Sequence, residues 1–246
     1  TGVGVSDIGP YVFQLNTTPL AQGRLLARIA IDSLKARTVA TLSSFEPQDR
    51  AMADAFAEEV RALGGEVFIQ EWFYPNTIDI RPQIAEIRLA SLLSDTSISE
   101  DIRRRLALDL PTELDTMRLM REARTIDVLL VSSNNEHDAI NIAAQIPTQK
   151  IWARILGGSI WGEQAVRQEA GEDVEGVVFA TGFDPGAESS RHFIGAYRLD
   201  RREDPSNITA LTYDATSLVV TAIASGARTR QQVRDYIAET SNWPGA

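Results

Sequence analysis

Residues 38–73 read TVATLSSFEPQDRAMADAFAEEVRALGGEVFIQEWF, and this stretch decides the fold of the chain. Thr38 to Leu42 is a short apolar and β-branched run, the pattern of a strand that is buried on both faces. Pro47 to Leu63 keeps helical spacing and ends at Gly64-Gly65, a typical glycine C-cap. Glu66 to Phe73 is again strand-like. A strand, a helix and a second strand of these lengths predict a βαβ unit in a parallel sheet.

The same alternation continues on both sides of this unit and predicts an α/β fold. Upstream, we expect a strand at Tyr11 to Leu15 and a helix from Pro19 to Lys35. Downstream, the patterns predict a helix near residues 82–93, strands at 126–131, 150–156 and 174–180, and a helix that ends near Gln145.

Two regions depart from the alternation. Residues 97–124 are a charged helical stretch broken at Pro111, which we interpret as an insertion. Beyond Asp184-Pro185-Gly186 the pattern is helical only, over residues 188–199, 207–225 and 229–240. Because amphipathic helices need a surface to cover, these three are expected to pack on another body, either a further lobe or a partner chain.

Composition excludes several classes of protein. The 246 residues include 24 basic and 34 acidic side chains, and a net charge of -10 argues against binding nucleic acid or anionic lipid. Cysteine is absent from the sequence, which excludes disulfides, thiolate zinc sites and a cysteine nucleophile. Residues 1–10 lack the basic and apolar regions of a signal peptide, so we expect the numbering to begin inside a longer precursor.

Catalytic and cofactor motifs are weak throughout the chain. The two histidines, His137 and His192, are 55 positions apart, and His137 is flanked by Glu136 and Asp138 as a surface residue would be. Neither a P-loop nor a glycine-rich dinucleotide fingerprint follows a predicted strand, and paired metal ligands at helical spacing are absent from the sequence. We therefore expect neither an enzyme, a cofactor nor a metal site.

Polar loops follow the predicted strands. In an open parallel sheet, ligands bind beyond the carboxyl ends of the strands, where hydroxyl, amide, glycine and aromatic residues suit a small polar ligand. The same serines and asparagines also suit simple helix capping, and both readings stay open. Trp161 is the favoured single contact, whereas Trp72 and Trp152 are expected in the core. The candidate ligand-binding residues are Ser43, Ser44, Phe45, Ser132, Ser133, Asn134, Ser159, Trp161, Phe183 and Asp184.

The order of several motifs resembles the type I periplasmic binding proteins, the extracellular ligand-binding receptors that include the branched-chain amino acid binding proteins of ABC transporters. Each motif alone is weak, but their order covers nearly the whole chain. The matching stretches are Pro10 to Asn16, Asp54-Ala55-Phe56 with Leu63 to Val67, Pro75 to Ile84, Glu175 to Phe179, Phe193 to Tyr197, and Ala210 to Ala215.

The resemblance implies a three-layer α/β/α lobe built on a parallel sheet, with extra C-terminal helices. It assigns residues 11–186 to lobe two, with the insertion at about 94–124. Residues 1–10 would be a linker or a remnant of lobe one, and residues 187–246 would belong partly to lobe one or the hinge side. The chain would then be a fragment lacking most of lobe one, and a homodimer of the fragment could cover its unpaired apolar faces.

The implied function is periplasmic binding of an amino acid or a similar small ligand, delivered to the membrane permease of an ABC transporter or read by a sensor. The resemblance also implies a periplasmic or extracellular location, with anchoring through a lipoprotein signal upstream of residue 1. Where the family has a tyrosine that can touch ligand, this chain has Phe45-Glu46-Pro47-Gln48-Asp49, so the tyrosine is replaced near Gln48, which argues against an ordinary amino acid ligand. The long region 89–124 resembles outer-membrane lipoproteins that activate penicillin-binding proteins, so the alternative is an envelope protein that binds another protein.

Overall fold

The computed structural model describes residues 5–94, 126–149, 151–241, 243 and 245. The predicted insertion, residues 1–4 and the start of the strand predicted at residue 150 lie outside this range. The chain divides into two compact units. We call residues 19–180 the sheet unit, and residues 1–18 with 181–246 the helical unit. The division into lobe one and lobe two stays a prediction.

The sheet unit is built on a five-stranded parallel sheet in the order β2-β1-β3-β4-β5. The strands are β1 (Thr38–Ser44), β2 (Glu66–Phe73), β3 (Val128–Ser132), β4 (Arg154–Gly157) and β5 (Val178–Phe179). The βαβ unit predicted from residues 38–73 is thereby confirmed. All five strands run in one direction, so their carboxyl ends lie along a single edge of the sheet.

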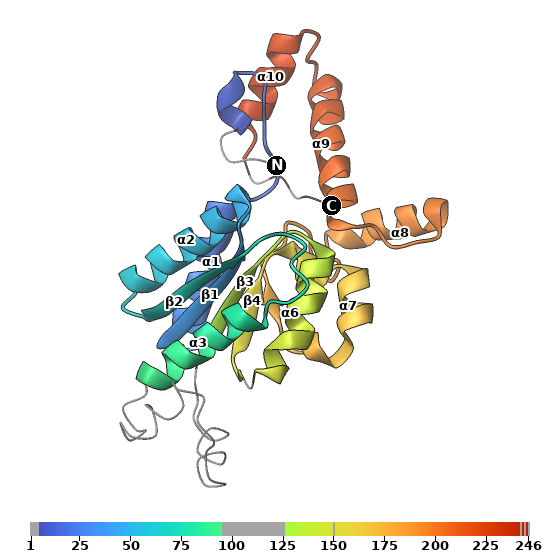
Figure 1. The fold of residues 1–246 in the computed structure, drawn as a ribbon. Coiled ribbons are helices and arrows are strands. Elements are labelled where there is room, and N and C mark those ends of the chain that lie inside the picture. The colour runs from blue at the N-terminus through green and yellow to red at the C-terminus, as the bar shows by residue number, and fades with distance from the viewer. Residues whose placement is uncertain (1–4, 95–125, 150, 242, 244, 246) are drawn as a thin grey trace. The chain divides into compact units, whose positions relative to one another are not determined.

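Helices cover both faces of this sheet (Figure 1). Over its described residues, the sheet unit has the α-helices α1 (Pro19–Arg28), α2 (Pro47–Ala62), α3 (Arg81–Ser94), α6 (Glu136–Thr148) and α7 (Gln164–Ala170). It also has the shorter helical turns η2 (Ile29–Ser33), η3 (Ser159–Gly162) and η4 (Gly171–Val174). Helices α1 and α2 pack on one face, and α3, α6 and α7 pack on the other.

Alternate residues of the central strand explain the three layers. Val128 and Leu130 belong to the core under α1 and α2, whereas Leu129 and Val131 belong to the core under α3, α6 and α7. Because successive side chains of a strand point to opposite faces, a continuous apolar run requires helices on both sides. The expected three-layer α/β/α architecture is confirmed.

The bounds of two predicted strands and the predicted burial of two tryptophans are wrong. Strand β4 begins only at Arg154, and Trp152 precedes it with 55% of its surface exposed. Trp72 lies within β2 but is 41% exposed, because β2 is the edge strand of the sheet. The strand predicted at 174–180 is reduced to the two residues of β5. Strands at the edge of a sheet pair with one neighbouring strand only, so a sequence pattern predicts their bounds and burial less well than those of central strands.

The helical unit consists, over its described residues, of η1 (Val5–Ile8), α8 (Ser190–Arg201), α9 (Asn207–Ala224) and α10 (Arg230–Glu239). The strand predicted at Tyr11 to Leu15 is wrong, because the described residues offer this segment no strand with which to pair. Ser206 caps α9, and Thr229 caps α10 in a capping box with Gln232. No helix in the described part of the chain is long and apolar enough to span a membrane.

Candidate ligand-binding site

Strand register brings two of the predicted loops together at the carboxyl edge of the sheet unit. Ser43 of β1 lies opposite Ser132 of β3, so the segments that follow both strands leave the sheet side by side. On the other side of β1, the backbone N–H of Phe45 donates to the carbonyl of Phe73 at 2.8 Å. The loops after β1, β2 and β3 therefore share this edge, as the parallel sheet predicts.

A buried carboxylate links the loops after β1 and β3. Asp49, in the first turn of α2, is only 3% exposed, and its Oδ1 accepts a 2.6 Å hydrogen bond from Nδ2 of Asn134. The hydroxyl of Ser132 donates to the backbone carbonyl of Asp49 at 3.0 Å. Ser44 Oγ accepts the backbone N–H of Glu46 at 3.2 Å. These contacts hold the start of α2 against the end of β3.

A second buried carboxylate links the loops after β3 and β2. Asp138, in the first turn of α6, is fully buried and accepts hydrogen bonds from the Ser133 hydroxyl at 3.1 Å and from the backbone N–H of Asn76 at 2.9 Å. Asn76 has a positive φ of 63°, and its Oδ1 accepts from Nδ2 of Asn135 at 3.1 Å. Asn135 also caps α6, its Oδ1 accepting the backbone N–H of His137 at 2.9 Å. The loop after β2 is thus fixed by side chains of the β3 loop.

Burial raises the pKa of Asp49 from 3.8 to about 6. Removal from water disfavours the charged carboxylate, and the nearby carboxyls of Glu46 and Asp138 act in the same direction. Hydrogen bonds from Ser44 and Asn134 oppose this rise because they stabilise the charged form. Asp49 therefore changes charge within the mildly acidic range.

Above these networks, two aromatic rings remain exposed. Phe45 is 46% exposed and Tyr74 is 70% exposed, and their ring centroids lie 5.2 Å apart. The guanidinium carbon of Arg50 lies 4.9 Å from the Phe45 centroid, within the range of a cation–π contact. Asn134 is exposed beside the same loops. The carboxyl edge therefore presents aromatic faces, an amide and a cation on a rigid support.

Most of the serines predicted to bind ligand are buried in the sheet unit and support its fold instead. Ser43, Ser44, Ser132 and Ser133 are all buried, and the last two donate to Asp49 and Asp138 as described above. The hydroxyl of Ser43 has no hydrogen-bond partner among the described residues. Of the six predicted residues in the loops after β1 and β3, the exposed ones are Phe45 and Asn134. Ser159, at the start of η3 after β4, is partly exposed.

Trp161 is buried, contrary to the expectation that it would contact a ligand. Its side chain is 2% exposed and packs in the core under α3, α6 and α7, while its indole N–H donates to the carbonyl of Val131 at 3.4 Å. Gly157 makes room for the ring, because a Cβ built there would overlap the indole. The glycine loop after β4 turns the tryptophan inward, so Trp161 is not carried forward as a ligand contact.

Phe183 and Asp184 belong to the helical unit. Phe183 is 8% exposed and packs edge-on against Phe193, with ring centroids 6.0 Å apart. Asp184 is exposed, and its Oδ1 accepts the backbone N–H of Gly186 at 2.8 Å in a turn. Their predicted part in ligand binding stays a prediction.

Sequence reasoning missed the two aspartates that hold the site together. The pattern around His137, with Glu136 and Asp138 on either side, predicts a surface position at the start of a helix; His137 is exposed, but Asp138 is fully buried. A signal was present: Ser44 precedes Asp49 by five positions, and Ser133 precedes Asp138 by five positions, each pair spanning the same strand-to-helix connection. A repeated serine and aspartate at this spacing is what two equivalent βα loops would need to pin their helices.

Comparisons with known proteins bear on the whole chain. A family model described as "Periplasmic binding protein" matches residues 4–246. A search of curated proteins gives no significant match.

Solved structures with the same fold cover nearly all of this chain. A Rhodospirillum rubrum protein described as a branched-chain amino acid ABC transporter is 21% identical with a TM-score of 0.76, covering 99% of this chain and 61% of its own. The leucine binding protein LivK of Thermotoga maritima is 19% identical with a TM-score of 0.70, covering 96% and 59%. The Streptococcus pneumoniae substrate binding protein LivJ, in complex with isoleucine, is 21% identical with a TM-score of 0.71, covering 100% and 61%. The chain therefore spans about three-fifths of the length of these structures.

Proposed function

Because the chain belongs to the periplasmic binding protein family, we propose that it is part of a receptor that binds a small amino acid-like molecule at the carboxyl edge of the sheet unit. The observation that carries this proposal is the exposed Phe45–Tyr74 pair, held beside Asn134 and Arg50 on loops pinned by buried carboxylates. Such a support costs little ordering entropy on binding, which favours affinity for a small ligand.

The chemistry of the edge suggests which parts of the ligand it would contact. Apolar atoms of the ligand would stack on Phe45 and Tyr74, both largely accessible. The Arg50 guanidinium is a planar donor suited to a carboxylate, and the exposed carboxylate of Glu46, four positions earlier, suits an ammonium group. A zwitterion with an apolar side chain combines all three features.

We further propose that binding, and not catalysis, is the role of this site, and that the receptor works in the periplasm or outside the cell with an ABC permease as its partner. Support comes from the family and from the similar solved proteins. One of these is described as a leucine binding protein, and another is in complex with isoleucine. Within the described residues, no group of three acidic or histidine side chains could hold a metal ion.

The test begins with the protein purified without refolding. Small molecules released by denaturation would be identified by mass spectrometry, and each would be titrated back by calorimetry. A stoichiometric amino acid-like molecule is expected. Phe45→Ala should weaken its affinity about fivefold to tenfold, since one stacked aromatic contact contributes roughly 1 kcal/mol.

The matched control is Trp152→Ala. Trp152 is also an exposed aromatic residue of the sheet unit, but it precedes β4, whereas the candidate residues follow the strands. This control should leave affinity unchanged. A protein that carries no small molecule and binds none of the twenty amino acids would contradict the proposal and favour the envelope protein that binds another protein.

A further inference from the structure

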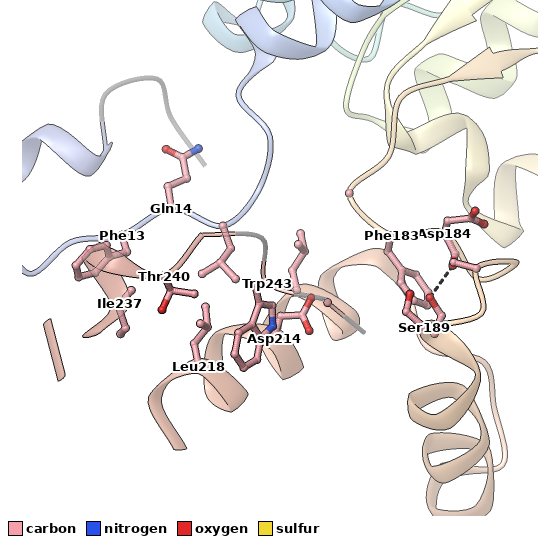
Figure 2. Close-up of a pocket in the computed structure, with 16 residues that line it drawn as sticks. Phe13, Gln14, Phe183, Asp184, Ser189, Asp214, Leu218, Ile237, Thr240 and Trp243 are labelled. Atoms are coloured by element: carbon pink, nitrogen blue, oxygen red, sulfur yellow. Dashed lines mark hydrogen bonds between the residues drawn. The ribbon is translucent and has the colours of Figure 1, made fainter. Parts of the chain in front are cut away.

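Among the described residues, three aspartates are at least nine-tenths buried, and their surroundings distinguish them. Asp138 accepts hydrogen bonds from within the sheet unit. Asp214 lines a pocket of about 550 Å³ in the helical unit, with Trp243 in the pocket wall (Figure 2). Asp49 differs from both, because it holds an exposed side chain of the candidate site, the amide of Asn134. The charge of Asp49 therefore acts on a residue that a ligand would meet.

The charge of Asp49 fixes which way the Asn134 amide is turned. An ionised carboxylate only accepts hydrogen bonds, and Asp49 Oδ1 accepts from Nδ2 of Asn134 at 2.6 Å. The amide nitrogen is thereby committed to the carboxylate, and the amide oxygen is left as the acceptor that Asn134 can offer to a ligand. A hydrogen bond to an ionised group is roughly twice as strong as one between neutral groups. Ionised Asp49 therefore holds Asn134 firmly as an acceptor.

Protonation of Asp49 reverses this arrangement. A carboxylic acid has an O–H donor of its own, and that donor needs an acceptor because the group is buried. Ser44 Oγ already accepts the backbone N–H of Glu46 at 3.2 Å, which uses one of its two acceptor positions. Among the described residues, none donates to the oxygen of the Asn134 amide, so this oxygen is the better acceptor. Turning inward to accept the proton, the amide directs its N–H groups toward a ligand.

The charged groups around Asp49 favour uptake of this proton. The carboxyls of Glu46, in the loop after β1, and of Asp138, in α6, add to the effect of burial, and together they raise the pKa of Asp49 to about 6. The guanidinium of Arg50, in the same helix as Asp49, lies over the Phe45 ring. No cation among the described residues offsets the three carboxyls.

Charged side chains on the other elements packed here have different partners. Helix α1 packs on α2 and has Arg24, which is exposed, and Arg28, which pairs with Glu59 at 2.9 Å. His137 is exposed in the first turn of α6, and its Nε2 lies 3.2 Å from Nδ2 of Asn141. Histidine is the side chain whose charge ordinarily changes between pH 5 and 8, so His137 needs a control of its own.

We propose that Asp49 makes the candidate site sensitive to pH by switching Asn134 between acceptor and donor. This inference rests on the proposed function, in which the site binds a zwitterion that has an ammonium group. While Asp49 is ionised, the Asn134 oxygen accepts a hydrogen bond from the ammonium. When Asp49 is protonated, the amide N–H groups oppose the ammonium, and the ligand binds more weakly.

The switch is tested first without ligand, by nitrogen-15 NMR of the Asn134 side-chain amide, whose signals are those missing in Asn134→Ala. In the parent protein they should shift between pH 7.5 and pH 5 with a midpoint near pH 6. His137→Gln should give the same titration, whereas Asp49→Asn should remove it. Signals that stay constant in the parent protein, or that shift equally in Asp49→Asn, would overturn the proposal whether or not a ligand is known.

Calorimetry with L-leucine then tests the effect on binding, because the ionisation of this zwitterion is constant between pH 5 and pH 7.5. Only about one molecule in eleven keeps Asp49 ionised at pH 5, so the affinity of the parent protein and of His137→Gln should fall about tenfold from pH 7.5. Asp49→Asn replaces the O–H donor by an amide N–H, and should bind at both pH values as weakly as the parent protein does at pH 5.

The two readouts separate failure of the switch from failure of the proposed function. Equal leucine affinity of the parent protein at pH 5 and pH 7.5 would overturn the regulation even if the amide signals shift. A parent protein that binds no leucine at pH 7.5 would count against the proposed function, and the titration of the Asn134 amide would still decide the switch.

Discussion

Asp138 in the sheet unit and Asp214 in the helical unit are both at least nine-tenths buried, but their surroundings differ. Asp138 accepts hydrogen bonds from Ser133 and from the backbone of Asn76, whereas Asp214 Oδ1 has no partner among the described residues. The first carboxylate is used by the fold itself, to fix loops that present other residues. The second is available to something outside the unit. A buried carboxylate with hydrogen-bond partners in its own unit thus supports that unit's fold, whereas one without such partners marks a position for a contact from outside the unit.

The two tryptophans Trp161 and Trp243 give the largest expected contrast between scaffold and pocket. Trp161→Ala empties a core position and should lower the free energy of unfolding by about 4 to 5 kcal/mol. Trp243→Ala removes a partly exposed pocket wall and should cost less than about 1 kcal/mol. Urea unfolding followed by circular dichroism would measure both. Equal losses for the two variants would break the distinction.

Substitution of Asp138 and Asp214 should give the next largest difference in the free energy of unfolding. Asp138→Ala leaves the Ser133 hydroxyl and the Asn76 N–H buried without an acceptor, and should lower the free energy of unfolding by about 3 to 4 kcal/mol. Asp138→Asn keeps one acceptor and should lose roughly half as much. Asp214→Ala, in the same urea experiment, should lose little or nothing. A larger loss at Asp214 than at Asp138 would reverse the comparison.

The raised pKa of Asp49 predicts a smaller effect, a dependence of the free energy of unfolding on pH. Burial raises its folded pKa to about 6 from 3.8, so the folded protein binds this proton more tightly than the unfolded chain. The contribution of Asp49 to stability is therefore greatest below pH 3.8 and is lost as the pH rises to about 6, by roughly 2 to 3 kcal/mol. Asp49→Asn should remove this part of the pH dependence. Identical pH profiles for the two proteins, measured by urea unfolding at pH 4, 5, 6 and 7, would show that the carboxyl is not perturbed.

Much of the sheet unit could be predicted from sequence, because its central strands carry strong and mutually consistent patterns. Residues 38–73 identified β1, α2 and β2, and the apolar run after Ile126 identified β3. Strands β1 and β3 are buried on both faces, so their side chains have few alternatives. The segment Tyr11 to Leu15 has a similar local pattern but no neighbouring strand among the described residues, and pairing is a property that sequence alone does not reveal.

The sequence predicted the edge of the sheet at which the candidate site lies better than it predicted which side chains are exposed there. Topology alone placed the loops after β1 and β3 at one edge, and the register of Ser43 opposite Ser132 agrees. Which side chains turn outward depends on packing, and there the serines and Trp161 turned inward. The roles of Asp49 and Asp138 depend on contacts with residues far away in the sequence. Asn76 lies 62 positions before Asp138, and Asn134 lies 85 positions after Asp49, so no local pattern encodes these pairs.

Hydrogen exchange with the recovered ligand tests the central claim most directly. The purified protein would be compared with and without the small molecule identified by mass spectrometry, and backbone protection would be mapped by peptide. We predict new protection in residues 44–50 and 74–79 and in the loop at 132–138, because ligand contact would order the exposed carboxyl edge. Protection that leaves these three segments unchanged, at saturating ligand, would contradict the assignment of the binding site.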